Sequence, residues 1–164
     1  LMHLFLQKVN LRENCDLTKL EELKEEMIAK NIISDEEAQS INLDKIRRFL
    51  ESNIAQKIKK AKQIEKEKAF CIKILAKDVF EQATDETILV QGIIDLYAIL
   101  ENGEILLLDY KTDFVENGNE DALIKKYSNQ LRIYKQALED SLDKNVNEVY
   151  IYSLWLNKAI KIEL

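Results

Sequence analysis

Two carboxylates and one lysine stand inside otherwise apolar stretches of the sequence. Asp95 interrupts the run GIIDLYAIL (92–100), and Asp109 and Lys111 end the run EILLLDYK (104–111). A buried carboxylate is costly unless it is paired with a cation or bound to a metal ion. Oxygen ligands of this kind select Mg²⁺ or Mn²⁺, which leave positions for water and phosphate oxygens. The residue types therefore point to metal-assisted phosphodiester hydrolysis, with Lys111 orienting the attacking water or offsetting transition-state charge.

The connection between the two runs decides whether these side chains meet. Because side chains alternate along a strand, Asp109 and Lys111 share one face. A two-residue Asn-Gly turn would put Asp95 on the other face. A three-residue loop over 101–103, with Gly103 in the left-handed conformation, or a strand bulge would place Asp95 opposite Asp109. We expect one of the latter two, while a purely structural Asp–Lys–Asp ion network stays open on spacing alone.

The first third of the chain predicts helices. The opening residues LMHLFLQKV already have the pattern of a helix face, which suggests a piece excised from a longer protein. Three further helix starts are marked by capping residues: Asp16 before 17–30, Ser34 with Glu37 as a capping box, and Asn42 before a helix reaching Phe49. A fourth helix is predicted over 54–61. The stripe predicted to be buried on the helix after Asp16 is Leu17, Leu20, Leu23 and Met27.

Beyond these helices the apolar period changes to that of strands. Strands are predicted over 69–79 (at least to Leu75), 87–100, 104–110, 148–156 and 159–163, with a long helix over 121–142. Near-continuous Ile, Leu and Val implies that the strands over 87–100 and 104–110 are covered on both faces. Gly92 is expected to let the backbone pass closely at the edge of the site. The whole chain, 1–164, is predicted to be one α/β domain with a mainly helical part (1–62) and an α/β core (63–164).

Composition excludes several classes of protein. The two cysteines, Cys15 and Cys71, are too few for a disulfide scaffold or a four-cysteine metal cluster. No apolar run reaches the roughly 18 residues of a membrane span, and no signal peptide opens the chain, so a cytoplasmic setting without a membrane is expected. No GxxxxGK[ST] loop is present, so we expect no ATPase within this chain.

Charge is distributed unevenly along the chain. The net charge of −6 argues against a protein that coats DNA nonspecifically, yet residues 45–68 hold nine basic and three acidic residues. The candidate phosphate contacts in this segment are Lys57, Lys59, Lys60 and Lys62. The alternative is a solvated helix face without any ligand.

The long helix carries a polar set of its own. Gln130 and Tyr134 are four residues apart and share one face with Tyr127, which is also compatible with ordinary amphipathic packing. The combination VQGIIDLYAIL, EILLLDYKTD and YSNQLRIYKQAL resembles the nuclease domains of AddA-type helicase–nuclease subunits, within the RecB-type PD-(D/E)xK nucleases. The resemblance spans most of the chain. It implies a restriction-endonuclease-like fold: a central mixed sheet flanked by helices, with an N-terminal helical layer. Ile94 stands where the superfamily's motif has proline, as is usual in the RecB branch.

The resemblance also implies roles for individual residues. Asp95 and Asp109 would ligate Mg²⁺ or Mn²⁺ together with the Tyr110 carbonyl, and Lys111 would be the catalytic lysine. His3 matches the histidine of the family's GTxxH motif, a further metal ligand, although a lone histidine on an apolar helix face is more often part of the core. Glu67 matches an upstream acidic residue or is an exposed strand glutamate. Tyr127, Gln130 and Tyr134 would contact a DNA strand or the active-site lysine.

At the level of the whole protein, the resemblance implies a DNA exonuclease that processes double-strand breaks for recombinational repair. Its substrate would be a single-stranded DNA end, its partner an AddB-type subunit, and helicase domains would lie upstream in the same chain. The alternative is a catalytically silent DNA-binding or subunit-docking domain of the same fold. A second alternative is an exonuclease with an iron–sulfur cluster, which two cysteines cannot hold.

Overall fold

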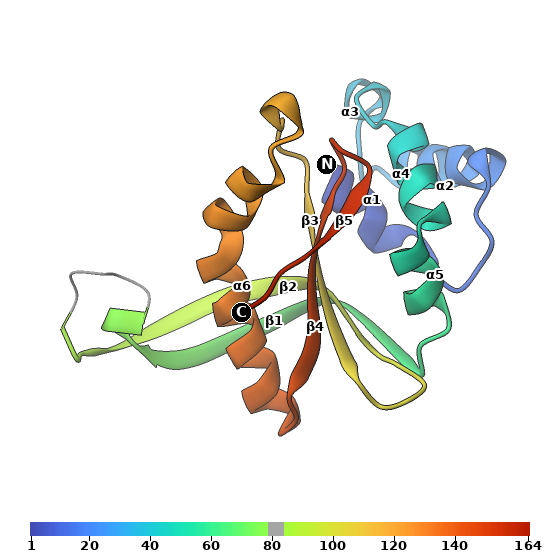
Figure 1. Cartoon of the computed structure of the whole chain (residues 1–164). Helices are drawn as coiled ribbons and strands as arrows, with labels where there is room; N and C mark the ends of the chain where they lie inside the picture. The colour runs from blue at the N-terminus through green and yellow to red at the C-terminus, as the bar shows by residue number, and fades with distance from the viewer. Residues whose placement is uncertain (79–83) are drawn as a thin grey trace.

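A computed structural model describes residues 1–78 and 84–164 (Figure 1). Its helices are α1 (Met2–Lys8), α2 (Leu17–Ala29), α3 (Asp35–Gln39), α4 (Leu43–Glu51), α5 (Asn53–Lys59) and α6 (Glu120–Leu142). Its strands are β1 (Gln63–Leu75), β2 (Thr87–Ile99), β3 (Ile105–Lys111), β4 (Val146–Ser153) and β5 (Lys158–Lys161). Val79, the last residue of a predicted strand, lies outside the described residues. None of the helices in the described ranges is both long and apolar enough to cross a membrane.

The five strands form one mixed sheet in the order β1-β2-β3-β4-β5. Strands β3 and β4 are parallel, and the other neighbours are antiparallel. A parallel pair needs a crossover connection, which α6 supplies between β3 and β4. The mixed central sheet predicted from the sequence is therefore confirmed.

Helices cover the centre of the sheet on both faces (Figure 1). Leu106, Leu108 and Tyr110 of β3 pack in one core with residues of α1, α2, α4 and α5. Ile105 and Leu107 pack in a second core with α6. Since consecutive β3 side chains enter different cores, β3 is a central strand buried on both sides, as its apolar run predicted.

The predicted helix caps are confirmed, but one predicted buried residue is wrong. The side chain of Asp16 accepts from the Lys19 N–H at 3.0 Å, and Ser34 and Glu37 form the capping box. Leu20 and Met27 of α2 are buried, whereas Leu17 is 42% exposed. Leu17 is the first residue of its helix and is not among the residues of the core that buries Leu20 and Met27.

Strands β1 and β2 extend beyond the rest of the sheet as a two-stranded arm (Figure 1). The prediction that β2 is covered on both faces is wrong for its first half, where Leu89 is 58% and Ile93 is 50% exposed. The prediction holds only where β2 pairs with β3, from Leu96 to Ile99. β1 also starts earlier than predicted, at Gln63 rather than near residue 69.

Candidate active site

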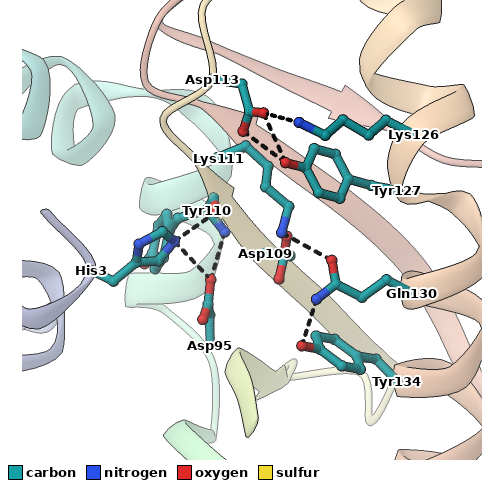
Figure 2. Close-up of polar contacts among 10 residues, drawn as sticks. All are labelled: His3, Asp95, Asp109, Tyr110, Lys111, Asp113, Lys126, Tyr127, Gln130 and Tyr134. Carbon is teal, nitrogen blue, oxygen red and sulfur yellow. Dashed lines mark hydrogen bonds and ion pairs between the residues drawn. The ribbon is translucent and has the colours of Figure 1, made fainter. Parts of the chain in front are cut away.

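The loop between β2 and β3 sets the register of the site. The Leu100 N–H donates to the Glu104 carbonyl at 2.8 Å, the Gly103 N–H donates to the Leu100 carbonyl at 2.9 Å, and Gly103 has φ +87°. This is the predicted three-residue loop with Gly103 in the left-handed region. Regular pairing continues to Leu96 and Leu108. Asp95 and Asp109 are each one residue further, so the register puts both on one side of the sheet. Figure 2 shows the Asp95 carboxylate next to His3 and the Tyr110 N–H, and Asp109 beside Lys111.

Strand pairing ends before Asp95 on the β3 side and is interrupted at Asp95 on the β1 side. Toward β3, the Asp95 carboxylate itself takes the Tyr110 N–H at 2.8 Å. Toward β1, the residue opposite Asp95 in the register is Glu67, whose φ of +53° interrupts the ladder between Lys66 and Lys68. A strand irregularity of this kind re-aims a side chain, which frees Asp95 to turn toward Asp109 and the edge of the sheet.

Lys111 forms the centre of the polar cluster (Figure 2). Its Nζ lies 2.6 Å from Asp109 Oδ2, and both side chains are nearly buried, with 12% and 3% exposed. The same ammonium donates to Gln130 Oε1 at 3.0 Å and lies 4.0 Å from the centre of the Tyr127 ring. The ion pair does not have hydrogen-bond angles, so Asp109 Oδ2 is a buried oxygen without a hydrogen-bond partner among the described residues.

Helix α6 holds Lys111 through a chain of hydrogen bonds. Gln130 Nε2 donates to the Tyr134 hydroxyl at 2.7 Å, and the Tyr127 hydroxyl donates to the Asp113 carboxylate at 2.8 Å. The predicted face of Tyr127, Gln130 and Tyr134 is therefore aimed at the site. Of the two contacts that the resemblance implied for these residues, the contact to the lysine is present.

Gly92 serves the site in a different way from the one expected. A Cβ at this position would lie 2.7 Å from the ring of Phe70, its partner across β1 and β2. The Phe70 ring in turn packs edge-on against Tyr134, with 5.4 Å between ring centres. The expectation of a close backbone approach is wrong: an aromatic side chain fills the space above Gly92. Sequence reasoning missed Phe70, although an aromatic residue in the strand that precedes a glycine-containing strand is a usable signal.

His3 reaches the site from α1. Its Nε2 lies 2.7 Å from the Tyr110 carbonyl oxygen and 3.4 Å from Asp95 Oδ2, and its side chain is 40% exposed. His3 is thus not a core histidine, and the ring edge points at two of the oxygens assigned to metal ligation (Figure 2).

Lys66 fixes the helix that carries His3. Its Nζ donates to the carbonyls of Leu6 at 3.2 Å and Gln7 at 3.0 Å, and also to that of Val9. These carbonyls lie at the C-terminal end of α1, where a cation satisfies acceptors that the helix leaves free. Burial lowers the pKa of Lys66 to about 8. Sequence reasoning missed this role because Lys66 was counted with the exposed basic segment.

The two carboxylates lie in surroundings that disfavour their charged form. Burial, and secondly the charge of Asp109, raise the pKa of Asp95 to about 6. Burial also raises the pKa of Asp109, and the Lys111 ammonium opposes that rise. A divalent ion beside these two carboxylates would stabilise the charged form that burial disfavours.

The residues present fit a divalent metal ion. Oxygen donors come from Asp95, Asp109 and the Tyr110 carbonyl, and a nitrogen donor comes from His3. A cation would give Asp109 Oδ2 a partner besides the Lys111 ammonium, and it would offset the burial and the Asp109 charge that raise the pKa of Asp95. In the described ranges no group of three or more His, Cys, Asp or Glu side chains is arranged to hold a metal ion, so His3, Asp95 and Asp109 do not form a preformed ligand set. A site with few protein ligands suits Mg²⁺ or Mn²⁺, which keep several waters.

The structure does not bring Glu67 into this cluster. No hydrogen bond or ion pair links Glu67 to Asp95, Asp109 or Lys111 in the part of the chain described. Its influence reaches the Tyr110 hydroxyl instead, whose pKa is raised first by burial and then by the charges of Asp95 and Glu67. That hydroxyl lies on the opposite face of the sheet from Asp109, in the core beneath the N-terminal helices.

The lysines of α5 and the turn after it lie near the other end of β2. Lys57 pairs with Glu148 at 2.6 Å, and Lys59 hydrogen-bonds to Asn14. Lys57 and Lys60 line a pocket of about 500 Å³ with Leu100. Leu100 is five residues from Asp95, or roughly 17 Å at ~3.3 Å per strand residue. These lysines therefore form a separate basic surface.

Comparison with known sequences agrees with the geometry. Residues 1–158 match the profile of the PD-(D/E)XK nuclease superfamily, and the chain belongs to that superfamily. It is 35% identical to the A subunit of the ATP-dependent helicase/nuclease of Clostridium novyi over 99% of this chain and 13% of that protein. The corresponding protein of Syntrophomonas wolfei is 34% identical, again over 99% and 13%. That of Thermoanaerobacter sp. strain X514 is 34% identical over 92% and 12%. The chain thus spans about an eighth of the length of these relatives.

Proposed function

We propose that this chain is a DNA nuclease domain that uses Mg²⁺ or Mn²⁺ to hydrolyse phosphodiester bonds at a single-stranded end. The observation that carries the proposal is the meeting of Asp95, Asp109 and Lys111 on one face, with His3 Nε2 and the Tyr110 carbonyl at their edge. Membership of a nuclease superfamily supports the same reaction class.

Each residue has a distinct task in this proposal. Asp95, Asp109, the Tyr110 carbonyl and His3 would hold the metal, which polarises the phosphoryl group and supplies a nucleophilic water when bound. Lys111, held between Asp109 and Gln130, would donate to the phosphate oxygens as negative charge grows on them. Tyr127 and Tyr134 limit the lysine to that direction, because one ring lies beside its ammonium and the other buttresses Gln130.

A cleavage assay tests the proposal directly. End-labelled single-stranded DNA should be degraded with Mg²⁺ or Mn²⁺ and left intact with a chelator, and Asp109→Asn should abolish degradation. Robust cleavage in excess chelator would rule out the metal mechanism. Absence of cleavage with every divalent metal tried would favour the silent DNA-binding or docking domain. That second candidate has one observation in its favour: Lys111 and Asp109 already satisfy part of each other's charge.

We also propose the setting in which the domain works. The relatives are named as parts of a helicase/nuclease, and the chain covers 12–13% of their length. We infer that helicase domains precede this region in the same polypeptide, that an AddB-type subunit is its partner, and that the complex processes double-strand breaks. Pull-down of the partner subunit with the intact polypeptide, and its loss on deleting the region, would test the interaction.

A further inference from the structure

Two exposed aromatic side chains lie beside each other at the edge of the site. Phe114 is 68% and Trp155 is 43% exposed, and no other aromatic side chain is exposed in the described ranges. Their ring centres are 4.8 Å apart in an edge-to-face arrangement. Aromatic rings of this size left in water are unusual unless they serve a contact.

The pair is tied to the catalytic strand. Phe114 follows Lys111 by three residues, which is at most ~10 Å of chain. Trp155 comes directly after Leu154, whose N–H donates to the Lys111 carbonyl at 2.8 Å. Both aromatics therefore stand where β3 and β4, the parallel pair, end at the same edge of the sheet.

The charges around the pair suit a polyanion. Lys45 of α4 places its ammonium 4.7 Å from the centre of the Trp155 ring, and no carboxylate pairs with it among the described residues. Two of the nearby acidic side chains are neutralised, since Asp113 pairs with Lys126 at 2.5 Å and Glu120 with Lys158 at 2.6 Å, whereas Glu116 forms no ion pair among the described residues. Proteins commonly bind single-stranded nucleic acids with this combination of an unpaired cation and exposed aromatic faces.

Phe114 is also accessible away from Trp155. It forms part of the wall of a surface pocket of about 410 Å³ between the loop after β3 and the start of α6. A base can therefore reach the Phe114 ring without displacing its aromatic neighbour.

We propose that Phe114 and Trp155 form a stacking platform for the bases of a single DNA strand, with Lys45 contacting its phosphates. This inference rests on the proposed function and deepens it, because it assigns the bases beside the scissile phosphate a binding site. Stacking tolerates any base, which suits a nuclease that must degrade any sequence.

The test uses the fact that Trp155 is the sole tryptophan of the sequence. In chelator, which prevents metal-dependent cleavage, oligodeoxythymidylate should quench the fluorescence of Trp155. An abasic oligonucleotide of equal length, which keeps the phosphates, should quench it little. Phe114→Ala should weaken binding about tenfold or more, and Phe114→Tyr should retain it. Leu89→Ala, which truncates another exposed apolar side chain on the β1–β2 arm, should have no effect.

Other outcomes would overturn the platform. DNA binding seen by anisotropy without quenching, or equal quenching by the abasic strand, would exclude base stacking, and so would the absence of any binding. The pair would then be a protein contact surface. Quenching is measured in chelator and cleavage in a separate assay with metal, so the two proposals can fail independently. Quenching by a protein that does not cleave when metal is supplied would count against the proposed nuclease activity alone, and cleavage with metal but without quenching in chelator would count against the platform alone.

Discussion

His3 and Tyr110 are 107 residues apart in the chain, yet His3 Nε2 lies 2.7 Å from the Tyr110 carbonyl oxygen. Both atoms are proposed metal ligands. In the contact itself Nε2–H must donate to the carbonyl, because a carbonyl oxygen can only accept. Metal binding would therefore require the other histidine tautomer, with the proton on Nδ1 and a free lone pair on Nε2.

Replacing His3 should weaken metal binding with little effect on folding. His3→Ala removes one of few protein ligands, so the affinity for Mn²⁺ should fall about 10–100-fold. The free energy of unfolding should change by less than about 1 kcal/mol, because the side chain is 40% exposed. Calorimetric titration and thermal melts measure both, with Gln7→Ala on the same helix as control. Unchanged Mn²⁺ affinity would remove His3 from the site.

Metal binding should depend on pH through Asp95. Its folded-state pKa of about 6 lies above the unfolded value of 3.8, so without metal its stabilising contribution is complete below pH 3.8 and lost as pH rises through 6. The metal binds the ionised form. The rise in melting temperature caused by Mn²⁺ should therefore be small at pH 5 and grow up to pH 7. Asp95→Asn should abolish that growth, and a pH-independent effect in the unmodified protein would contradict this account.

Replacing Asp109 and replacing Lys111 should have different effects on metal binding and cleavage. Asp109→Asn should lose both metal binding and cleavage while the protein stays folded. Lys111→Met should still bind Mn²⁺, with cleavage reduced by roughly two to four orders of magnitude.

The same pair distinguishes catalysis from a structural ion network. If the network were purely structural, Lys111→Met would cost roughly 3–5 kcal/mol of stability whether or not metal is present, without affecting nuclease activity. In the metal mechanism, Mn²⁺ restores the stability that the variant loses. Melts of Lys111→Met with and without Mn²⁺ decide between them.

Gly92 should tolerate a side chain only if Phe70 is made smaller. A Cβ at Gly92 would lie 2.7 Å from the Phe70 ring, so Gly92→Ala should cost about 1–3 kcal/mol and slow cleavage by shifting Tyr134 and Gln130. Phe70→Leu should recover part of the stability in the Gly92→Ala background. A double-mutant cycle on melting and cleavage measures this coupling, and strictly additive effects would refute it.

The basic surface beside α5 makes a separate prediction. Lys60 and Lys62 are exposed and form no ion pair among the described residues, so Lys60→Gln with Lys62→Gln should flatten the log–log salt slope of single-strand binding by about 1.4, at ~0.7 per phosphate contact. Lys57→Gln, which removes a cation already paired with Glu148, is the control. An unchanged slope would make this segment an ordinary solvated face.

Local signals in the sequence were sufficient for much of the fold and for the centre of the site. Capping at Asp16 and Ser34 depends on neighbours within three residues, and the Gly103 loop fixed the face of Asp95 through the two-residue strand period. Both rules depend only on residues close in sequence, which is why the caps and the loop could be predicted and are confirmed by the structure.

The failures are tertiary. A run of apolar residues predicts that a strand is buried, but it does not show whether another element packs on each part of it. The exposed first half of β2 was therefore missed. The start of β1 was missed because residues 65–68 are all charged and lack apolar alternation, and Lys66 fits into the strand only because carbonyls some sixty residues earlier accept from its ammonium. The left-handed backbone of Glu67 has no signal in its residue type at all.

Lys66 and α1 make the catalytic centre conditional on long-range assembly. The helix packs on the sheet through its buried side chains Phe5 and Leu6, and the Lys66 ammonium binds the carbonyls at its C-terminal end. A metal ion held partly by His3 would further stabilise the docked position of α1. Resistance of residues 1–9 to a protease should therefore report occupancy of the proposed metal site, and in a nascent chain that site would stay incomplete until β3 has been synthesised and α1 has docked on it.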